Sequence, residues 1–99
     1  MYLDGYIKEI TQLCQANSVR TLYAFGSVLT DQFNSGSDID LVVDINSDDA
    51  LDYGEKYFDL KFSLQDLLKR KIDLLEGSEI RNKYFIEELE KTKSLVYGS

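Results

Sequence analysis

The sequence contains no histidine, no proline and no tryptophan, and it has one cysteine among 99 residues. Without histidine the chain cannot form a Ser-His-Asp triad, a Cys-His pair or a histidine-ligated zinc site. The single cysteine, Cys14, excludes an internal disulfide and is typical of a protein from a reducing compartment. Any catalysis must therefore use carboxylates and metal ions, and 18 Asp and Glu residues are available for it.

Basic residues are also scarce, since 11 Lys and Arg against 18 Asp and Glu give a formal net charge of −7. Affinity for nucleic acid comes mainly from Lys and Arg, so this chain is expected to be a poor general nucleic-acid binder. The one dense basic cluster is Lys69-Arg70-Lys71. The cluster lies at the end of a predicted helix, where positive charges interact favourably with the helix dipole. We therefore favour this interpretation over a nucleic-acid-binding patch.

Long apolar runs are absent as well. No basic stretch followed by an apolar run indicates a signal peptide, and no segment approaches the roughly 20 apolar residues that cross a bilayer. We therefore expect a cytoplasmic protein that does not contact a membrane. The length and the 43% hydrophobic content predict one globular domain over residues 1–99.

Hydrophobic periodicity predicts helices at 2–16 and 50–69, a short helical segment at 28–33 and a last helix at 80–91 with Ser78 as its N-cap. Cys14 lies on the apolar face of the first helix and is interpreted as a core residue. The middle of 50–69 also alternates like a strand, but its length favours a helix.

β-Forming residues predict strands at 20–25, 38–45, 71–75 and 94–97. The fold class expected from this order is α+β, a small mixed sheet with helices packed on it. Turns must rely on Gly, Asn and Ser, because proline is missing.

Two aspartates at the start of the second strand are the first candidate site. Asp38 and Asp40 are two residues apart, so their carboxylates point to the same face of a strand. Two close negative charges raise each other's pKa unless a cation lies between them. Mg²⁺ prefers oxygen ligands and removes this conflict, although an Asp-x-Asp pair by itself is a weak signal.

Asp73 and Gly26-Ser27 complete the candidate site. Asp73 lies within an apolar strand, and if that strand is a neighbour of Asp38 and Asp40, three carboxylates converge and can hold two metal ions about 3.5–4 Å apart. The alternative is a water-facing residue, or a partner of Lys71. Gly26-Ser27 joins a strand to a helical turn, where free N–H groups favour a phosphate.

The combined pattern consists of Gly26-Ser27, ten further residues, Asp38-Ile39-Asp40 and a third Asp on a later strand. This pattern resembles that of the minimal nucleotidyltransferases of the polymerase-beta-like superfamily, the MntA-type antitoxins among them. The resemblance covers nearly the whole chain and implies the polymerase-beta-like nucleotidyltransferase fold. It also implies two Mg²⁺ ions, ATP as substrate, triphosphate binding by Gly26 and Ser27, and metal binding by Asp38, Asp40 and Asp73.

The resemblance further implies transfer of AMP to an acceptor, plausibly a tyrosine of a HEPN-domain toxin that this chain would neutralise as an antitoxin. Many relatives have an Arg three residues after the serine, where this chain has Thr30. Two other hypotheses stay open. The chain could mask a basic toxin sterically, which its acidic charge favours, or transfer a nucleotide to RNA or a small molecule. A homo-oligomer is also possible.

Overall fold

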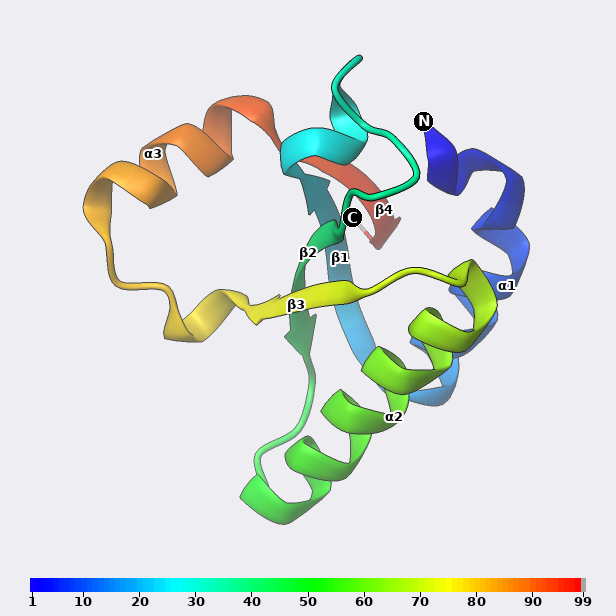
Figure 1. Cartoon of the computed structure of the whole chain (residues 1–99). Helices are drawn as coiled ribbons and strands as arrows, with labels where there is room; N and C mark the ends of the chain where they lie inside the picture. The colour runs from blue at the N-terminus through cyan, green and yellow to red at the C-terminus, as the bar shows by residue number, and fades with distance from the viewer. Residues whose placement is uncertain (99) are drawn as a thin grey trace.

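Four strands form one mixed sheet at the centre of the computed structural model, which describes residues 1–98 (Figure 1). The strand order is β3-β2-β1-β4. β1 (Val19–Phe25) lies antiparallel to both β2 (Ile39–Ile45) and β4 (Ser94–Gly98), whereas β2 and β3 (Ile72–Glu76) are parallel. The sheet is therefore mixed, as the sequence predicted.

Three α-helices surround the sheet: α1 (Ile7–Ala16), α2 (Ala50–Leu68) and α3 (Lys83–Thr92). Short 3-10 helices precede α1 (η1, Tyr2–Tyr6) and follow β1 and β3 (η2, Gly26–Leu29; η3, Gly77–Glu79). Figure 1 shows α1 and α2 together on one side of the sheet and α3 on the other. The predicted α+β class is confirmed, while Ser99, the last residue of the expected domain, lies outside the described residues.

The hydrophobic core lies between α1, α2 and one face of the sheet. Alternate residues of β2 point into it, with Ile39, Leu41 and Val43 at most 1% exposed. α2 contributes residues at helical spacing, and α1 contributes Cys14, which is fully buried as predicted. The buried cluster also contains Leu3, Ile10, Val19, Leu22, Ala24, Val28, Ile45, Leu60, Leu64, Leu68, Ile72 and Leu74.

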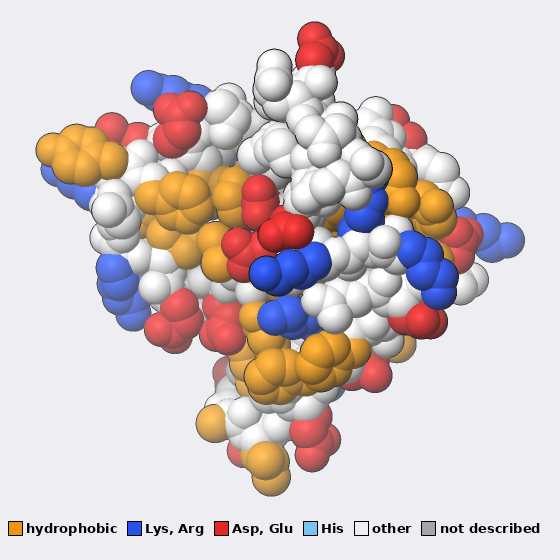
Figure 2. Space-filling model, in the orientation of Figure 1, with side chains coloured by type: hydrophobic (Ala, Val, Ile, Leu, Met, Phe, Trp, Pro, Cys, Tyr) orange, Lys and Arg blue, Asp and Glu red, His pale blue; other side chains and the backbone are white. Residues whose placement is uncertain are grey.

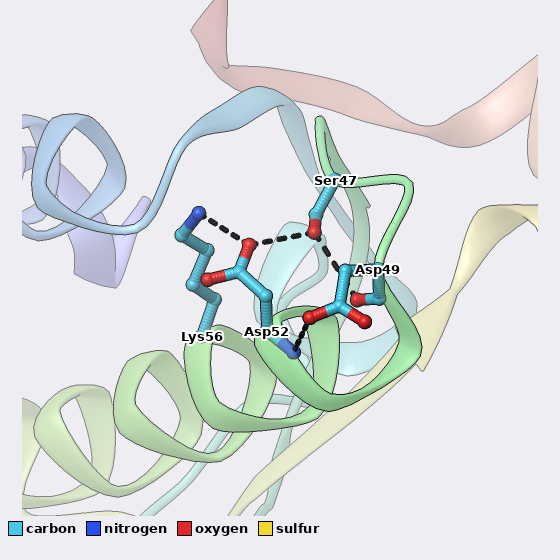
Figure 3. Close-up of polar contacts among 4 residues, drawn as sticks. All are labelled: Ser47, Asp49, Asp52 and Lys56. Atoms are coloured by element: carbon cyan, nitrogen blue, oxygen red, sulfur yellow. Dashed lines mark hydrogen bonds and ion pairs between the residues drawn. The ribbon is translucent and has the colours of Figure 1, made fainter.

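The start of α2 is fixed by its own acidic residues (Figure 3). The Asp49 carboxylate caps the helix by accepting a hydrogen bond from the Asp52 backbone N–H at 3.2 Å. Asp52 in turn accepts hydrogen bonds from Lys56 at 2.7 Å and from Ser47 at 2.6 Å, which lower the pKa of its carboxyl group. These contacts satisfy a helix end that would otherwise have free N–H groups.

Several local predictions differ from the structure. The first five residues of the helix expected at 2–16 form the 3-10 helix η1, and the helix expected at 80–91 begins only at Lys83. The segment 28–33 was expected to be helical, but the only helical turn is the 3-10 segment η2, after which Thr30 is already extended. Ser78 was predicted to cap the last helix, yet Asn82 does so by accepting a hydrogen bond from the Phe85 N–H at 3.0 Å. Ser78 instead lies in η3, because the chain makes one further turn before α3 begins.

None of the helices within residues 1–98 is both long enough and apolar enough to span a membrane.

Candidate active site

Strand pairing brings three predicted site residues to one end of the sheet. Asp40 is the second residue of β2, and its Cα pairs with Phe25 at the end of β1 on one side and with Asp73 of β3 on the other. Asp38 immediately precedes β2. Because side chains alternate along a strand, Asp40 faces away from the core that Ile39 enters.

Burial differs among the three carboxylates. Asp40 is half-buried and Asp73 is exposed. Burial raises the pKa of the Asp40 carboxyl group above its usual value, and the negative charges of Asp73 and Asp38 raise it further. The Asp38 side chain is 50% exposed and lies 4.0 Å from Lys71 Nζ. Asp40 is therefore held close to two like charges.

Gly26 is required where β1 ends. Its φ is +75°, a conformation that L-residues with side chains rarely adopt. A Cβ built on Gly26 would lie 2.5 Å from the Asp40 Oδ2 atom, so only glycine allows the carboxylate to approach this backbone so closely. The glycine that the sequence singled out for a phosphate therefore also borders the Asp40 carboxylate.

Ser27 lies in the 3-10 turn η2, directly beside Gly26. Its carbonyl accepts hydrogen bonds from the Thr30 N–H at 2.9 Å and the Thr30 hydroxyl at 3.0 Å. η2 has four residues, so the α-helix dipole expected at this junction is missing. Any anion binding here depends on the close approach at Gly26 and on the Ser27 hydroxyl.

A cavity of about 500 Å³ adjoins this end of the sheet, between η2 and α3. Gly26 is among its lining residues, and the ring of Phe25 meets that of Phe85 edge to face at a centroid distance of 5.7 Å. The lining residues are Phe25, Gly26, Leu29, Thr30, Phe85, Glu88, Leu89 and Thr92. No local sequence pattern predicts the contribution of α3, since only the tertiary fold brings α3 to the end of β1.

The donor set fits Mg²⁺ in its chemistry. All three side chains offer carboxylate oxygens, the ligands that Mg²⁺ prefers, and a divalent cation would offset the repulsion that raises the pKa of Asp40. In residues 1–98, however, no three acidic or cysteine side chains are already gathered as a metal cluster. Asp38 and Asp73 have exposed side chains, and exposed side chains can change rotamer when an ion binds.

Acidic side chains gather near the middle of the face shown in Figure 2, over the region where β2 and β3 lie side by side in Figure 1, with basic side chains next to them. Asp38 and Lys71 directly precede the parallel strands β2 and β3, so their contact lies where these two strands begin. An acidic surface bordered by lysine suits a ligand that combines a metal cation with phosphate groups.

Comparison with known proteins identifies the family. The sequence profile of the family described as "Polymerase beta, Nucleotidyltransferase" matches residues 8–99. Over 96 residues the chain is 31% identical to a provisionally named protein adenylyltransferase of Methanocaldococcus jannaschii, covering 92% of this chain and 93% of that protein.

Solved structures agree in fold. A provisionally named minimal nucleotidyltransferase has a TM-score of 0.76 at 22% identity, over 93% of this chain and 90% of that chain. A toxin-antitoxin structure with AMP-PNP has a TM-score of 0.70 at 21% identity, over 94% of this chain and 73% of that chain. A complex of the tri-AMPylated HEPN toxin of Shewanella oneidensis with its MNT antitoxin has a TM-score of 0.65 at 20% identity, over 100% of this chain and 74% of that chain.

The family profile covers most of the chain, and the sheet and helices match the fold of minimal nucleotidyltransferases. The resemblance drawn from the sequence is thus confirmed, and this chain belongs to the polymerase-beta nucleotidyltransferase family.

Proposed function

We propose that this nucleotidyltransferase transfers AMP from ATP to a hydroxyl group of a protein, using Asp38, Asp40 and Asp73 as ligands of two Mg²⁺ ions. The observation that carries the proposal is the register at one end of the sheet. Asp40 pairs with both Phe25 and Asp73, and Gly26 follows Phe25 directly. A phosphate-binding turn and two of the three carboxylates are therefore neighbours on adjacent strands.

The three carboxylates have different tasks in this proposal. Asp38 and Asp40 would hold both ions, and Asp73 would hold the ion on the acceptor side and accept the proton of the hydroxyl. When bound, the ions polarise the phosphates and stabilise the charge that develops on the leaving group. The acceptor oxygen forms a bond to the α-phosphorus, the bond from that phosphorus to the bridging oxygen breaks, and pyrophosphate leaves.

The cavity beside Gly26 is the proposed site for the nucleoside part of ATP. Phe25 and Phe85 offer aromatic surface for the base, while Thr30, Glu88 and Thr92 offer polar groups at the rim. A volume of about 500 Å³ lies within the usual range for a small-molecule site. The triphosphate would then reach Gly26 and Ser27 at the mouth of the cavity.

A protein acceptor is supported by two relatives. The Methanocaldococcus jannaschii relative is named a protein adenylyltransferase, and a structure of similar fold contains an AMPylated HEPN toxin with its antitoxin. We infer that the acceptor of this chain is a tyrosine of a HEPN-type partner and that the chain acts as its antitoxin. Both the partner and the base preference for adenine belong to this proposal.

The test is the intact mass of the protein encoded next to this chain, after co-expression of the two. A gain of one or more AMP units that disappears in Asp38→Ala supports adenylylation and the metal site together. Asp44→Ala is the matched control, because Asp44 also lies on β2 but pairs with Arg20 near the opposite end of the strand. That variant should modify the partner as the wild type does.

A non-catalytic masking role is the second candidate function. α2 exposes Leu51, Phe58 and Phe62 by 72%, 52% and 58%, which is apolar surface that a partner could cover. An unmodified partner that remains in a stable complex with the wild type, and equally with Asp38→Ala, would favour masking. AMP found on RNA, with no protein modified, would favour transfer to nucleic acid.

A further inference from the structure

Arg70 takes no part in the proposed chemistry, although it lies within the basic triplet that follows α2. Lys69 ends the helix in a left-handed conformation with a φ of 55°. This reversal directs the chain away from the helix axis just before Arg70. The Arg70 side chain meets the turn 34–37, which directly precedes Asp38.

One nitrogen of Arg70 holds both ends of that turn. Its Nη1 donates hydrogen bonds to the backbone carbonyl of Asn34 at 2.9 Å and to that of Ser37 at 2.8 Å. Hydrogen bonds from a charged donor are about twice as strong as neutral ones. The guanidinium therefore fixes the separation of the two carbonyls that bracket the turn.

Two aromatic rings fix the guanidinium itself. The Arg70 Cζ atom lies 4.9 Å from the centre of the Tyr2 ring and 4.5 Å from that of Phe33. The Tyr2 hydroxyl donates to the Leu68 carbonyl at 3.0 Å, which ties this ring to the end of α2. A planar guanidinium can stack on these rings and donate in its plane at the same time, which a lysine ammonium cannot do.

The turn needs an external support because its own bonds are local. The Asn34 side chain accepts from the Gly36 N–H at 2.8 Å, and the Asn34 carbonyl accepts from the Ser37 N–H at 3.0 Å. Gly36 adds conformational freedom that such a short turn does not remove. Beyond the turn, the Ile39 N–H donates to the Lys71 carbonyl at 3.0 Å. Asp38 thus lies between two points of attachment to residues 70 and 71.

We propose that Arg70 is a positioning residue that holds the 34–37 turn so that the Asp38 carboxylate stands beside Asp40 for metal binding. The inference rests on the proposed role of Asp38 as a metal ligand. Arg70 touches neither the ion nor the nucleotide, and acts only through the backbone that precedes Asp38. Metal sites need their ligands held to within about 0.5 Å, which an exposed glycine-containing turn cannot supply alone.

The test measures Mn²⁺ binding by water-proton relaxation and backbone hydrogen exchange over residues 34–38, both without nucleotide or acceptor. Arg70→Ala should weaken Mn²⁺ affinity about tenfold, the lower end of the effect of removing a supporting group from a metal site. It should also speed exchange at the Gly36 and Ser37 amides. Arg70→Lys keeps the charge but loses the planar fork, so it should show most of the same loss.

Arg20→Ala is the control for loss of one arginine charge, because Arg20 pairs with Asp44 and Asn46 at the opposite end of β1. It should bind Mn²⁺ as the wild type does. Wild-type affinity in both Arg70→Ala and Arg70→Lys, or an equal loss in Arg20→Ala, would overturn the inference. If Arg70→Ala does not fold, as judged by its melting curve, Arg70→Lys decides the outcome.

The result also separates this inference from the proposed function. In one outcome, Asp38→Ala abolishes Mn²⁺ binding and Arg70→Lys weakens it, but the wild type transfers no AMP. This outcome would retain the positioning role and reject the enzyme activity. AMP transfer by the wild type, together with unchanged Mn²⁺ affinity in Arg70→Lys, would retain the enzyme activity and reject the positioning role. A wild type that binds no Mn²⁺ without nucleotide would reject the positioning role, whereas AMP transfer to the partner decides the proposed function.

Discussion

The two faces of the sheet have opposite properties, although the same strand supplies both. On the face covered by α1 and α2, Ile39, Leu41 and Val43 of β2 are at most 1% exposed. On the face toward α3, Asp40 lies close to two like charges and next to a cavity. One-residue alternation along β2 therefore separates a closed apolar core from a polar surface that is open to a ligand.

This difference shows how a chain of 99 residues can remain stable although its candidate site contains carboxylates that repel one another. Like charges and an open cavity reduce the stability of the α3 face, and the fold tolerates them because the other face packs mainly apolar side chains. Among the described residues, no buried side-chain nitrogen or oxygen lacks a hydrogen-bond partner. The repulsion between Asp40 and the carboxylates of Asp38 and Asp73 is a different kind of unfavourable interaction. It lies where a cation is proposed to bind.

The largest expected effect on stability comes from a substitution on the apolar face of the sheet that α1 and α2 cover. Leu41→Ala should lower the free energy of unfolding by about 3 kcal/mol, because it opens a cavity in a site that is 1% exposed. Val42→Ala, its neighbour on the α3 face, should cost about 1 kcal/mol, because Val42 is 8% exposed and the substitution removes fewer carbon atoms than Leu41→Ala. Urea unfolding followed by circular dichroism gives both values, and a Val42→Ala loss as large as that of Leu41→Ala would contradict the separation of the two faces.

A smaller effect is expected from adding a positive charge to the open face. Thr30 lines the cavity and lies three residues after Ser27. Thr30→Arg should lower the KM for ATP about fivefold, since a partly exposed cation near phosphates contributes roughly 1 kcal/mol. Thr30→Ala serves as the control for the hydrogen bonds that Thr30 makes to Ser27. A KM for Thr30→Arg equal to that of Thr30→Ala would place the phosphates elsewhere.

The smallest effect concerns the repulsion at Asp40 itself. A carboxyl group whose pKa is raised on folding destabilises the fold when it is ionised, fully above the folded pKa and not at all below the unfolded one. Asp40→Asn should therefore stabilise the metal-free protein at pH 7 by about 0.5 kcal/mol, the size of a cross-strand like-charge effect. The gain should shrink as the pH falls through the raised folded pKa of Asp40 and should be absent below about 4, near the unfolded pKa of an aspartate. Thermal melts across pH measure it, and a lower melting temperature at pH 7 would show that Asp40 is stabilising.

Much of the site could be predicted from sequence because it depends on local patterns. Alternation in 38–45 placed Ile39 in the core and Asp40 opposite it, and the third aspartate lay in a recognisable strand. Within the order β3-β2-β1-β4, Asp73 is a neighbour of Asp40 because β3 pairs with β2, and these two residues are 33 positions apart in the chain. No local pattern specifies such pairing.

Other features depended on contacts that propensities do not contain. The cavity requires α3 to pack against β1, and the true N-cap, Asn82, lies four residues beyond the predicted Ser78 because η3 intervenes. Arg70 was interpreted as part of a charge cluster at a helix end. Its contacts with Tyr2 and Phe33 come from residues far away in sequence, so nothing nearby revealed its role.

The most direct test of the central claim is the melting temperature of the wild type and of Asp40→Asn, each with and without Mg²⁺ and a non-hydrolysable ATP analogue. Because a ligand that binds only the folded state stabilises it, the wild type should gain about 1.4 kcal/mol at a ligand concentration ten times the dissociation constant. Asp40→Asn should gain little, despite being the more stable protein without ligand. An equal gain in both proteins would contradict the claim that the acidic face binds the metal and the nucleotide.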